Sequence, residues 1–396
     1  MKYQIINGNN IDVLKTFPDN HFDSIVTDPP YGIDFLGKAW DANTGALETY
    51  QECLRVLKPG GHILAFSAAR TYHHLAITLE QAGFEIRDQI MWIYSSGFPK
   101  SQDVGKSIDR AAGKKDPNYG SKKTAKQGNE TVGDFSSGAR CGKCNRTFNA
   151  DIIKDCKEEP CGMRYTHQTK DGKQWAGWGT ALKPAHEPIA LARKPIKGSI
   201  KDNVLKHGVG ALNIDACRIE SETLTYPANG MNRITFNQAE PNKWEGDSVT
   251  NDQGRFPSNV LGEIAEEYQK YFYCPKVSRR ERHIGFDDPG ALFSGPRIEA
   301  LANDPSNKLK DAEKGSGNNH PTVKPIELMK YLIKLVTPQG GIVLDPFNGS
   351  GSTGCAAVEL GYEYVGIELD PAYVEIATKR IEAWNKDDTS FSELFE

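Results

Sequence analysis

Short apolar runs alternate with amphipathic stretches at both ends of the chain. Near the N-terminus this pattern predicts strands over 3–7, 23–28 and 60–67, a strand pair over 85–95, and helices over 11–17, 46–57 and 71–83. Near the C-terminus it predicts helices over 324–337, 352–361 and 371–384, and strands over 340–347 and 363–369. Continuous apolar strands between amphipathic helices indicate a mostly parallel sheet that is covered on both faces.

Neither end of the chain carries enough strands for a comfortable domain of its own. We therefore expect one α/β sheet built from both ends, with the middle of the chain inserted. The predicted boundaries are a first half over 1–98, an inserted region over 99–319, a second half over 320–384 and a flexible tail over 385–396.

The composition is that of an ordinary soluble globular protein. The 396 residues are 38% hydrophobic and 25% charged, and the net charge is -4. No window approaches the roughly 20 apolar residues that a membrane span needs. The N-terminus lacks a signal-peptide pattern and eight cysteines occur, so a reducing cytoplasm with no membrane partner is expected.

A glycine-rich turn, VLDPFNGSGSTG over 343–354, follows a predicted strand and opens a predicted helix. Its glycines let the backbone approach a ligand closely. Glu368 ends the next predicted strand about twenty residues later, where a carboxylate can accept hydrogen bonds from both hydroxyls of a ribose. Asp345 would repel a pyrophosphate, so the turn favours a cationic ligand such as the sulfonium of S-adenosylmethionine.

The stretch DSIVTDPPYGI, residues 23–33, is an apolar run that stops at Asp28, Pro29, Pro30 and Tyr31. Prolines do not continue a central strand, so a turn is expected there. A carboxylate and a rigidly held peptide carbonyl can each accept one N–H of a nucleobase amine, which localises the lone pair of its nitrogen. A tyrosine ring offers a stacking face for a base that has left its helix.

These two motifs together resemble the beta-group amino-methyltransferases of DNA, which modify adenine N6 or cytosine N4. TDPPYG precedes DPFNGSGST, and HPTVKP at 320–325 is similar to the additional cofactor motif of that family. The segment KPAHEPIALARKP in the middle also has a familiar look. The resemblance implies a Rossmann-like S-adenosylmethionine-dependent methyltransferase sheet, circularly permuted, with a large inserted target-recognition region.

The resemblance also implies a role for each matching residue. Asp28 and the backbone of Pro29 and Pro30 would bind the target amine, and Tyr31 would stack on the base. Lys324 would pair with the carboxylate of the cofactor, and Glu368 would hold its ribose. The cofactor-binding residues implied are Asn9, Thr322, Lys324, Asp345, Phe347, Gly349, Gly351, Ser352 and Glu368. Lys38 and Trp40, in the loop after Tyr31, are further candidates for closure over the base.

The function expected from this resemblance is transfer of a methyl group to adenine N6 in double-stranded DNA, because the first residue of the catalytic motif is Asp. Cytosine-N4 methylation is the alternative. Methylation of RNA or of a protein amide, and a non-catalytic DNA-binding module, are further alternatives. A homodimer and a cognate restriction nuclease are open as partners.

Four cysteines in the middle segment, Cys141, Cys144, Cys156 and Cys161, have a spacing that can close a tetrahedral structural zinc site. The alternative is four reduced thiols in a loop. Cytosine-C5 chemistry through Cys161 is not favoured, because this cysteine does not follow a predicted sheet strand. Trp175, Trp178 and Trp244 are interpreted as core residues rather than base contacts.

Overall fold

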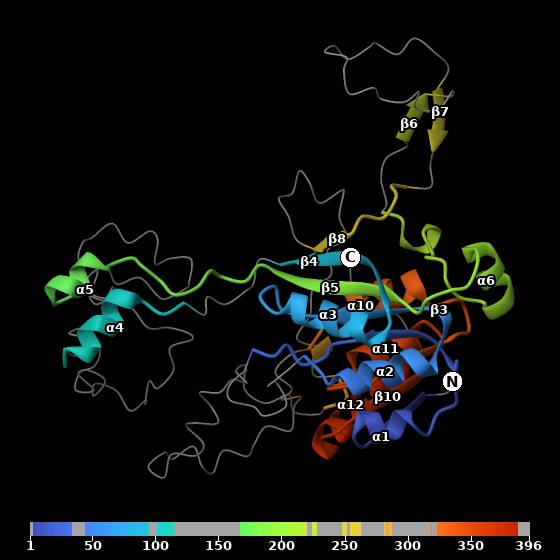
Figure 1. Ribbon diagram of the computed structural model, residues 1–396, viewed down its shortest axis with the longest axis horizontal. Coiled ribbons are helices and arrows are strands. Elements are labelled where there is room, and N and C mark those ends of the chain that lie inside the picture. The colour runs from blue at the N-terminus through green and yellow to red at the C-terminus, as the bar shows by residue number, and fades with distance from the viewer. Residues whose placement is uncertain are drawn as a thin grey trace. The chain divides into compact units, whose positions relative to one another are not determined.

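The computed structural model confirms an α/β fold in which both ends of the chain share one sheet (Figure 1). It describes residues 3–33, 44–94, 101–114, 167–219, 224–227, 248–251, 254–262, 281–282, 284–286, 318 and 323–386. Within these ranges the chain falls into two compact units, Met1–Ser95 with Ala185–Glu396, and Ser96–Pro184.

Eight strands form the large sheet, in the order β1-β10-β9-β2-β3-β5-β4-β8. The strands are β1 (Tyr3–Asn7), β2 (Phe22–Thr27), β3 (Leu57–Phe66), β4 (Glu85–Ile93), β5 (His186–Arg193), β8 (Val260–Gly262), β9 (Ile342–Asp345) and β10 (Glu363–Glu368). A separate antiparallel pair consists of β6 (Leu224–Pro227) and β7 (Ser248–Asn251). The helices are α1 (Asn10–Leu14), α2 (Leu47–Val56), α3 (Tyr72–Ala82), α4 (Val104–Ala111), α5 (Lys170–Gln174), α6 (Ile200–His207), the 3-10 helix η4 (Asp215–Cys217), α10 (Ile326–Val336), α11 (Ser352–Glu359) and α12 (Pro371–Lys386).

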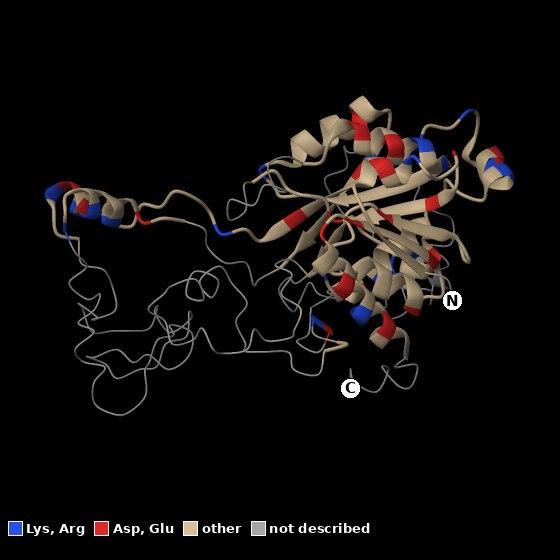
Figure 2. Ribbon diagram, turned by 90° about the horizontal axis from the view of Figure 1, so that it is seen from below, with Lys and Arg blue, Asp and Glu red and all other residues tan. Residues whose placement is uncertain are grey.

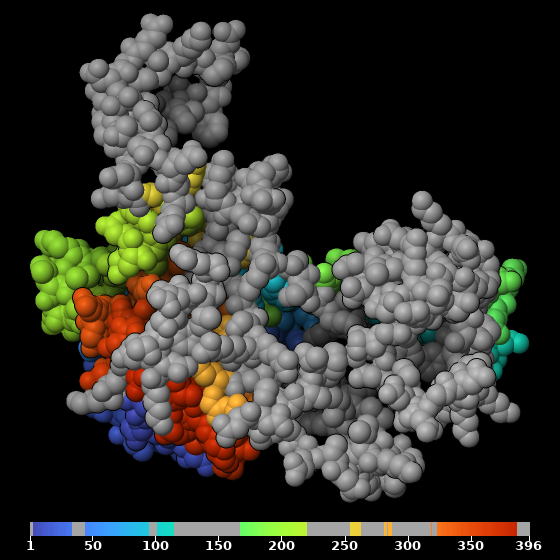
Figure 3. Space-filling view, turned by 180° about the vertical axis from the view of Figure 1, so that it is seen from behind, coloured from blue at the N-terminus to red at the C-terminus, as the bar shows by residue number. Residues whose placement is uncertain are grey.

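The centre of the sheet joins residues more than 300 apart in the sequence. Strand β2 pairs in parallel with β9, with Ser24 opposite Val343 and Ile25 opposite Leu344. The N-terminal strand β1 likewise pairs in parallel with β10. In the space-filling view, blue N-terminal residues and red C-terminal residues adjoin on one face (Figure 3). The predicted sharing of one sheet by the two ends is therefore confirmed.

Helices cover both faces of this sheet (Figures 1 and 2). Because side chains alternate along a strand, Ile25 and Val26 belong to opposite faces. Ile25 packs in a core with residues of α1, α2 and α3, including Leu14, Tyr50 and Leu75. Val26 packs in a second core with α10, α11 and α12. These buried layers fix the ends of β2 and β9 against each other.

Two sequence predictions are corrected by the strand order. The strand pair predicted over 85–95 is one strand, β4, and its antiparallel partner is β5 from the middle of the chain. Strand β5 lies between β3 and β4, and β8 extends the same sheet beyond β4. The region predicted as an insert over 99–319 therefore contributes two strands to the main sheet. Periodicity cannot show this, since a short apolar run such as PIALA does not name its partners.

The second unit contains α4 and α5, and its described residues are 101–114 and 167–184. Asp109 is fully buried and joins the two helices, because its carboxylate accepts hydrogen bonds from the backbone N–H groups of Gln168 and Thr169. Trp175 and Trp178 have relative exposures of 40% and 61%. The prediction that these two tryptophans are core residues is therefore wrong, and Trp244 lies outside the described residues.

No helix in the described part of the chain combines the length and the apolar character needed to cross a bilayer. The same residues contain no group of three or more His, Cys, Asp or Glu placed to hold a metal ion. The four cysteines predicted to bind zinc lie outside the described residues, as do Lys38, Trp40 and Thr322.

Candidate active site

Three acidic residues stand at the carboxyl ends of neighbouring parallel strands. Asp28 directly follows β2, Asp345 ends β9 and Glu368 ends β10. The registers of β2 with β9 and of β9 with β10 bring these ends to one edge of the sheet. In open α/β sheets this edge is where ligands bind.

The carboxylate of Asp345 ties the two predicted motifs together. Thr27, the last residue of β2, donates its hydroxyl to Asp345 Oδ1 at 2.7 Å. Thr353 in α11 donates to Oδ2 at 2.7 Å, and the backbone N–H of Phe347 donates to Oδ1 at 3.1 Å. Burial raises the pKa of Asp345 to about 6, although these three hydrogen bonds favour the charged form. The turn after β2 and the glycine-rich loop after β9 thus belong to one site.

The glycine-rich loop is held against β10 by Glu368. The backbone N–H of Gly349 donates to Glu368 Oε2 at 2.8 Å, and that of Asp370 donates to Oε1 at 2.9 Å. Burial raises the pKa of Glu368 above its ordinary value, against the effect of these bonds. A fully buried arginine, Arg380 of α12, supports the loop by donating to the backbone oxygen of Ser350. The predicted loop residue Ser352 lies within 3.4 Å of the same guanidinium.

Gly351 precedes α11 with a φ of +78°, and a Cβ added there would lie 3.0 Å from the Cβ of Ala377. Gly361 has nearly the same φ, +79°, but a Cβ there would meet nothing within 4 Å. We expect Gly361→Ala to lower the free energy of unfolding by about 1–2 kcal/mol, the backbone cost alone. Gly351→Ala should cost at least about 1 kcal/mol more, because crowding is added. Urea unfolding of both variants measures the difference, and equal losses would contradict the crowding.

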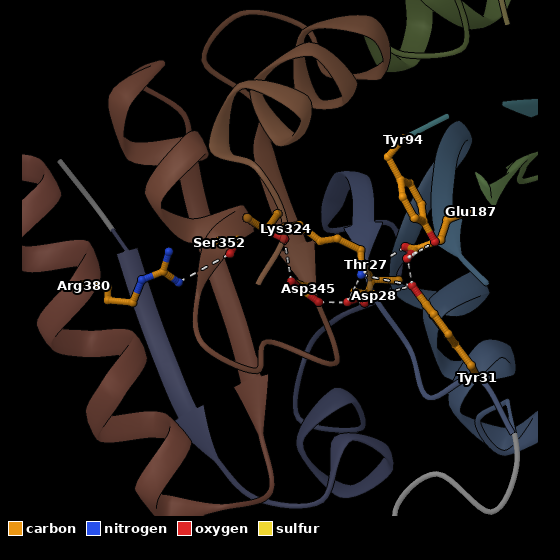
Figure 4. A network of polar contacts seen from close by, with 10 residues as sticks. Thr27, Asp28, Tyr31, Tyr94, Glu187, Lys324, Asp345, Ser352 and Arg380 are labelled. Carbon is orange, nitrogen blue, oxygen red and sulfur yellow. Dashed lines mark hydrogen bonds and ion pairs between the residues drawn. The ribbon is translucent and has the colours of Figure 1, made fainter. Parts of the chain in front are cut away.

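A lysine lies beside the predicted catalytic motif (Figure 4). Lys324 Nζ donates to Asp28 Oδ2 at 2.6 Å and to the hydroxyl of Tyr31 at 3.0 Å, and it lies 3.4 Å from Glu187 Oε2. The Tyr31 hydroxyl is within 2.8 Å of Asp28 Oδ1 and 2.9 Å of Glu187 Oε2. Tyr94, just after β4, donates to Glu187 Oε1 at 3.4 Å. These side chains come from four separate segments of the chain.

The protonation states within this cluster follow from burial and charge. Burial alone would lower the pKa of Lys324, but attraction to Asp28 and Glu187 outweighs it, so the pKa is raised and the lysine stays charged. Burial, together with the same two carboxylates, holds the pKa of Tyr31 well above its ordinary value. Tyr31 therefore remains a neutral hydroxyl that can donate a hydrogen bond.

The remaining predicted residues lie around this edge. Pro29 is buried and Pro30 half-buried directly after Asp28. Asn9 follows β1 and caps α1, accepting from the backbone N–H of Ile11 at 2.9 Å. Phe347 lies 6.4 Å from Tyr50, centroid to centroid. Lys324 was predicted to pair with a carboxylate of the cofactor, and in the structure its hydrogen bonds go to the catalytic motif.

Sequence reasoning missed Glu187 as a member of the site. The residue sits in the segment KPAHEPIALARKP, directly before the buried part of β5, so it precedes an apolar run, whereas Asp28 follows one. Because β5 is antiparallel to β3 and β4, its first residues lie at the edge where the parallel strands end. Only the direction of β5 reveals that Glu187 faces the site.

The sequence and the fold of this chain are similar to those of known DNA methyltransferases. A family profile described as DNA methylase matches residues 22–379. The type II methyltransferase M.HindIII of Haemophilus influenzae is 23% identical over 95% of this chain and 94% of that protein. The DNA adenine methyltransferase YhdJ of Escherichia coli is 34% identical, but over only 24% of this chain and 28% of its own length. The solved M1.HpyAVI–SAM complex is 17% identical over 96% of this chain and 99% of that chain, with a TM-score of 0.40.

Proposed function

Because the chain belongs to the DNA methylase family, we propose that it transfers a methyl group from S-adenosylmethionine to the N6 amine of adenine in double-stranded DNA. One observation carries the proposal: Thr27, which precedes Asp28, is hydrogen-bonded at 2.7 Å to Asp345 of the glycine-rich loop. An acceptor for an amine and a pocket for a cationic ligand therefore adjoin. The similarity to YhdJ, which is named as a DNA adenine methyltransferase, and the Asp at the start of the predicted catalytic motif favour adenine.

The residues at the edge of the sheet suit S-adenosylmethionine. The acids Asp345 and Glu368 adjoin a loop whose Gly349 and Gly351 have positive φ, as close backbone approach requires. Glu368 would accept from the ribose, Asp345 would favour the cationic end, and Asn9, Phe347, Ser352, Thr322 and Lys324 complete the proposed pocket. When bound, the cofactor supplies an electrophilic methyl group on a positively charged sulfur.

In this proposal the turn after β2 prepares the amine. Asp28 accepts one N–H and the carbonyl at Pro29 accepts the other, so the lone pair of the nitrogen is directed at the methyl group. The nitrogen would gain positive charge as its bond to the methyl carbon forms and the carbon–sulfur bond breaks, leaving a neutral thioether, and its extra proton would then leave to water. Asp28 thus polarises and positions the amine. Tyr31 stacks on the flipped base, once its hydroxyl is released from the two carboxylates.

The affinity for S-adenosylmethionine should depend on the charge of Asp345. Burial raises the pKa of this acid to about 6, so lowering the pH through that value protonates it and removes the attraction for a cationic ligand. We expect affinity at pH 5 to be about tenfold weaker than at pH 7. Calorimetric titration of the cofactor across this range measures the change.

Asp345→Asn provides the matched control, because an amide cannot titrate. Its affinity should be weak and independent of pH between pH 5 and pH 7. Burial also raises the pKa of Glu368, so Glu368→Gln is compared in the same titration. If the pH dependence of affinity survives in Asp345→Asn and vanishes in Glu368→Gln, Glu368 is responsible for it and the prediction for Asp345 is wrong.

We propose that Ser96–Pro184 contacts DNA as part of the target-recognition region. In its described residues the exposed basic side chains are Arg110, Lys114, Lys170, Lys173 and Lys183, and the exposed acids are Asp103 and Asp171. Asp103 is 3.2 Å from His167 and caps α4, so its charge is partly engaged. Basic side chains beside two exposed tryptophans suit a phosphate backbone and unstacked bases.

Other expectations remain proposals. Zinc at Cys141, Cys144, Cys156 and Cys161 would fold part of the inserted region. A homodimer and a cognate restriction nuclease remain proposed partners. Action in the cytoplasm is proposed because the substrate is DNA.

The direct test is base-resolved sequencing of DNA from cells that express the protein, beside cells that express Asp28→Ala. New N6-methyladenine at one recurrent sequence, absent from the variant, is expected. Methyl groups on cytosine N4 instead would identify cytosine, the alternative, as the substrate base. Marks that persist with Asp28→Ala would overturn the catalytic assignment, and cofactor binding with no transfer to any DNA would support a non-catalytic module.

A further inference from the structure

One lysine is shared by two carboxylates beside the proposed target site (Figure 4). Lys324 Nζ lies 2.6 Å from Asp28 Oδ2 and 3.4 Å from Glu187 Oε2. Asp28 belongs to the turn after β2, Glu187 is the second residue of β5, and Lys324 precedes α10. Three distant segments have therefore been brought together to place one positive charge between two negative ones.

The arrangement is largely removed from water. The side-chain exposure is 6% for Lys324, 19% for Asp28 and 20% for Glu187. The ammonium also lies 5.0 Å from the ring centroid of Phe66 and 5.4 Å from that of Tyr31. A buried ammonium needs compensating charge, and here both carboxylates and two aromatic faces supply it.

The two carboxylates are close to each other. A single atom, the Tyr31 hydroxyl oxygen, lies within 2.8 Å of Asp28 Oδ1 and 2.9 Å of Glu187 Oε2. Among the residues that the structure describes, the other titratable groups that face the cluster are Tyr94, which donates to Glu187, and Asp345, whose pKa the charge of Asp28 raises further. Without an intervening cation, like charges at this separation favour protonation of one partner.

We propose that Lys324 and Glu187 are positioning residues that hold Asp28 ionised and correctly oriented for the target amine. The inference rests on the proposed function, and it assigns Lys324 to the amine acceptor and gives Glu187 a part in the reaction. Lys324 prevents the two acids from sharing a proton, since a protonated Asp28 would donate a hydrogen bond where it must accept one.

Glu187 sets the net charge of the cluster. Asp28 and Lys324 alone would form a neutral pair, in which the ammonium absorbs the charge of the acceptor. With Glu187 the three groups carry a net charge of -1, so negative potential remains where positive charge develops on the attacking nitrogen. Both residues act through Asp28, so their removal should change the rate and its pH dependence more than cofactor affinity.

The decisive measurement is the pH profile of kcat with DNA and cofactor saturating. In Lys324→Met no cation separates Asp28 from Glu187. The acid limb of the profile, where kcat falls as the pH is lowered, should therefore shift to higher pH by at least about one unit. In Glu187→Gln we expect kcat to fall at least about tenfold, with little change in the KM for cofactor. In the double variant, which combines Lys324→Met with Glu187→Gln, Asp28 no longer faces a second carboxylate at position 187. The acid limb should therefore return toward its wild-type position.

Lys330 offers a matched control for the loss of a doubly paired lysine. Its Nζ lies 2.7 Å from Glu327 of α10 and 2.6 Å from Glu359 of α11, and neither partner belongs to the Asp28 cluster. Lys330→Met should lower stability without moving the acid limb. Far-UV circular dichroism and urea unfolding check that each variant folds.

A second measurement does not depend on activity. Protein labelled with ¹³C at aspartate carboxyl carbons allows Asp28 to be titrated by NMR, with Asp28→Asn used for assignment. The midpoint for Asp28 should rise in Lys324→Met and fall back in the double variant. An unmoved midpoint, or a double variant no closer to wild type than Lys324→Met, would overturn the inference. Wild-type protein that methylates no DNA would refute the proposed function, and this titration would still decide the role of Lys324.

Discussion

Replacing Asp28 with asparagine is expected to reduce methyl transfer by roughly 10³-fold while cofactor affinity changes little. The amide has nearly the same shape, but it carries no charge and presents one acceptor oxygen in place of two. Its Oδ2 position would also no longer neutralise Lys324 at 2.6 Å. Single-turnover transfer to DNA measures the rate, and calorimetry measures cofactor binding.

Asp23 provides the control on the same strand. It lies near the opposite end of β2, is almost fully buried, and pairs with Lys58 at 2.6 Å. Asp23→Asn should destabilise the fold, because its other oxygen accepts from the backbone N–H of Ile342. Its transfer rate should stay within about twofold of wild type. An Asp28→Asn variant that keeps a tenth of the wild-type transfer rate would contradict the proposed role of this carboxylate.

Replacing both Trp175 and Trp178, in the unit Ser96–Pro184, with alanine is expected to raise the KM for DNA by at least about tenfold. The kcat at saturating DNA should be unchanged. Trp175 and Trp178 pack edge to face with centroids 5.3 Å apart, and each retains a large exposed area. Stacking on an exposed aromatic ring contributes about 1–3 kcal/mol for each base that has left the stack of the duplex. Initial rates over a range of DNA concentrations measure the effect.

Leu182 separates stacking from general apolar contact. Its side chain is 93% exposed in the same unit but has no ring. Leu182→Ala should leave the KM for DNA within about twofold of wild type. Equal losses for Leu182→Ala and the double tryptophan variant would show that exposed apolar area, rather than stacking, holds the DNA.

Much of the main sheet could be read from local pattern. The strand predicted over 3–7 is β1 residue for residue, and the helix predicted over 71–83 is α3 to within one residue at each end. Both depend on nearest neighbours: a short apolar strand, and a helix closed by Gly83 in the left-handed conformation. Asp28 and Asp345 were also within reach, because an acid that ends an apolar run marks the edge of a sheet.

The placement of Glu187 and Lys324 was beyond local pattern. Glu187 faces the site only because β5 inserts antiparallel between β3 and β4. Lys324 reaches Asp28 only because α10 follows it and packs across the face that carries Val26. The exposure of Trp175 and Trp178 is equally non-local, since an aromatic residue is buried only when some other element covers it.

By itself the sequence determined most elements at the two ends of the chain, the acid at the end of each of three strands and the family to which the chain belongs. These follow from side-chain spacing and short motifs, which depend on residues near one another in the chain. The tertiary structure alone decided that β5 completes the sheet and that a single ammonium is shared by Asp28 and Glu187. Coulomb interactions depend on distance in space, and residues 28, 187 and 324 become neighbours only when strands far apart in the chain pair.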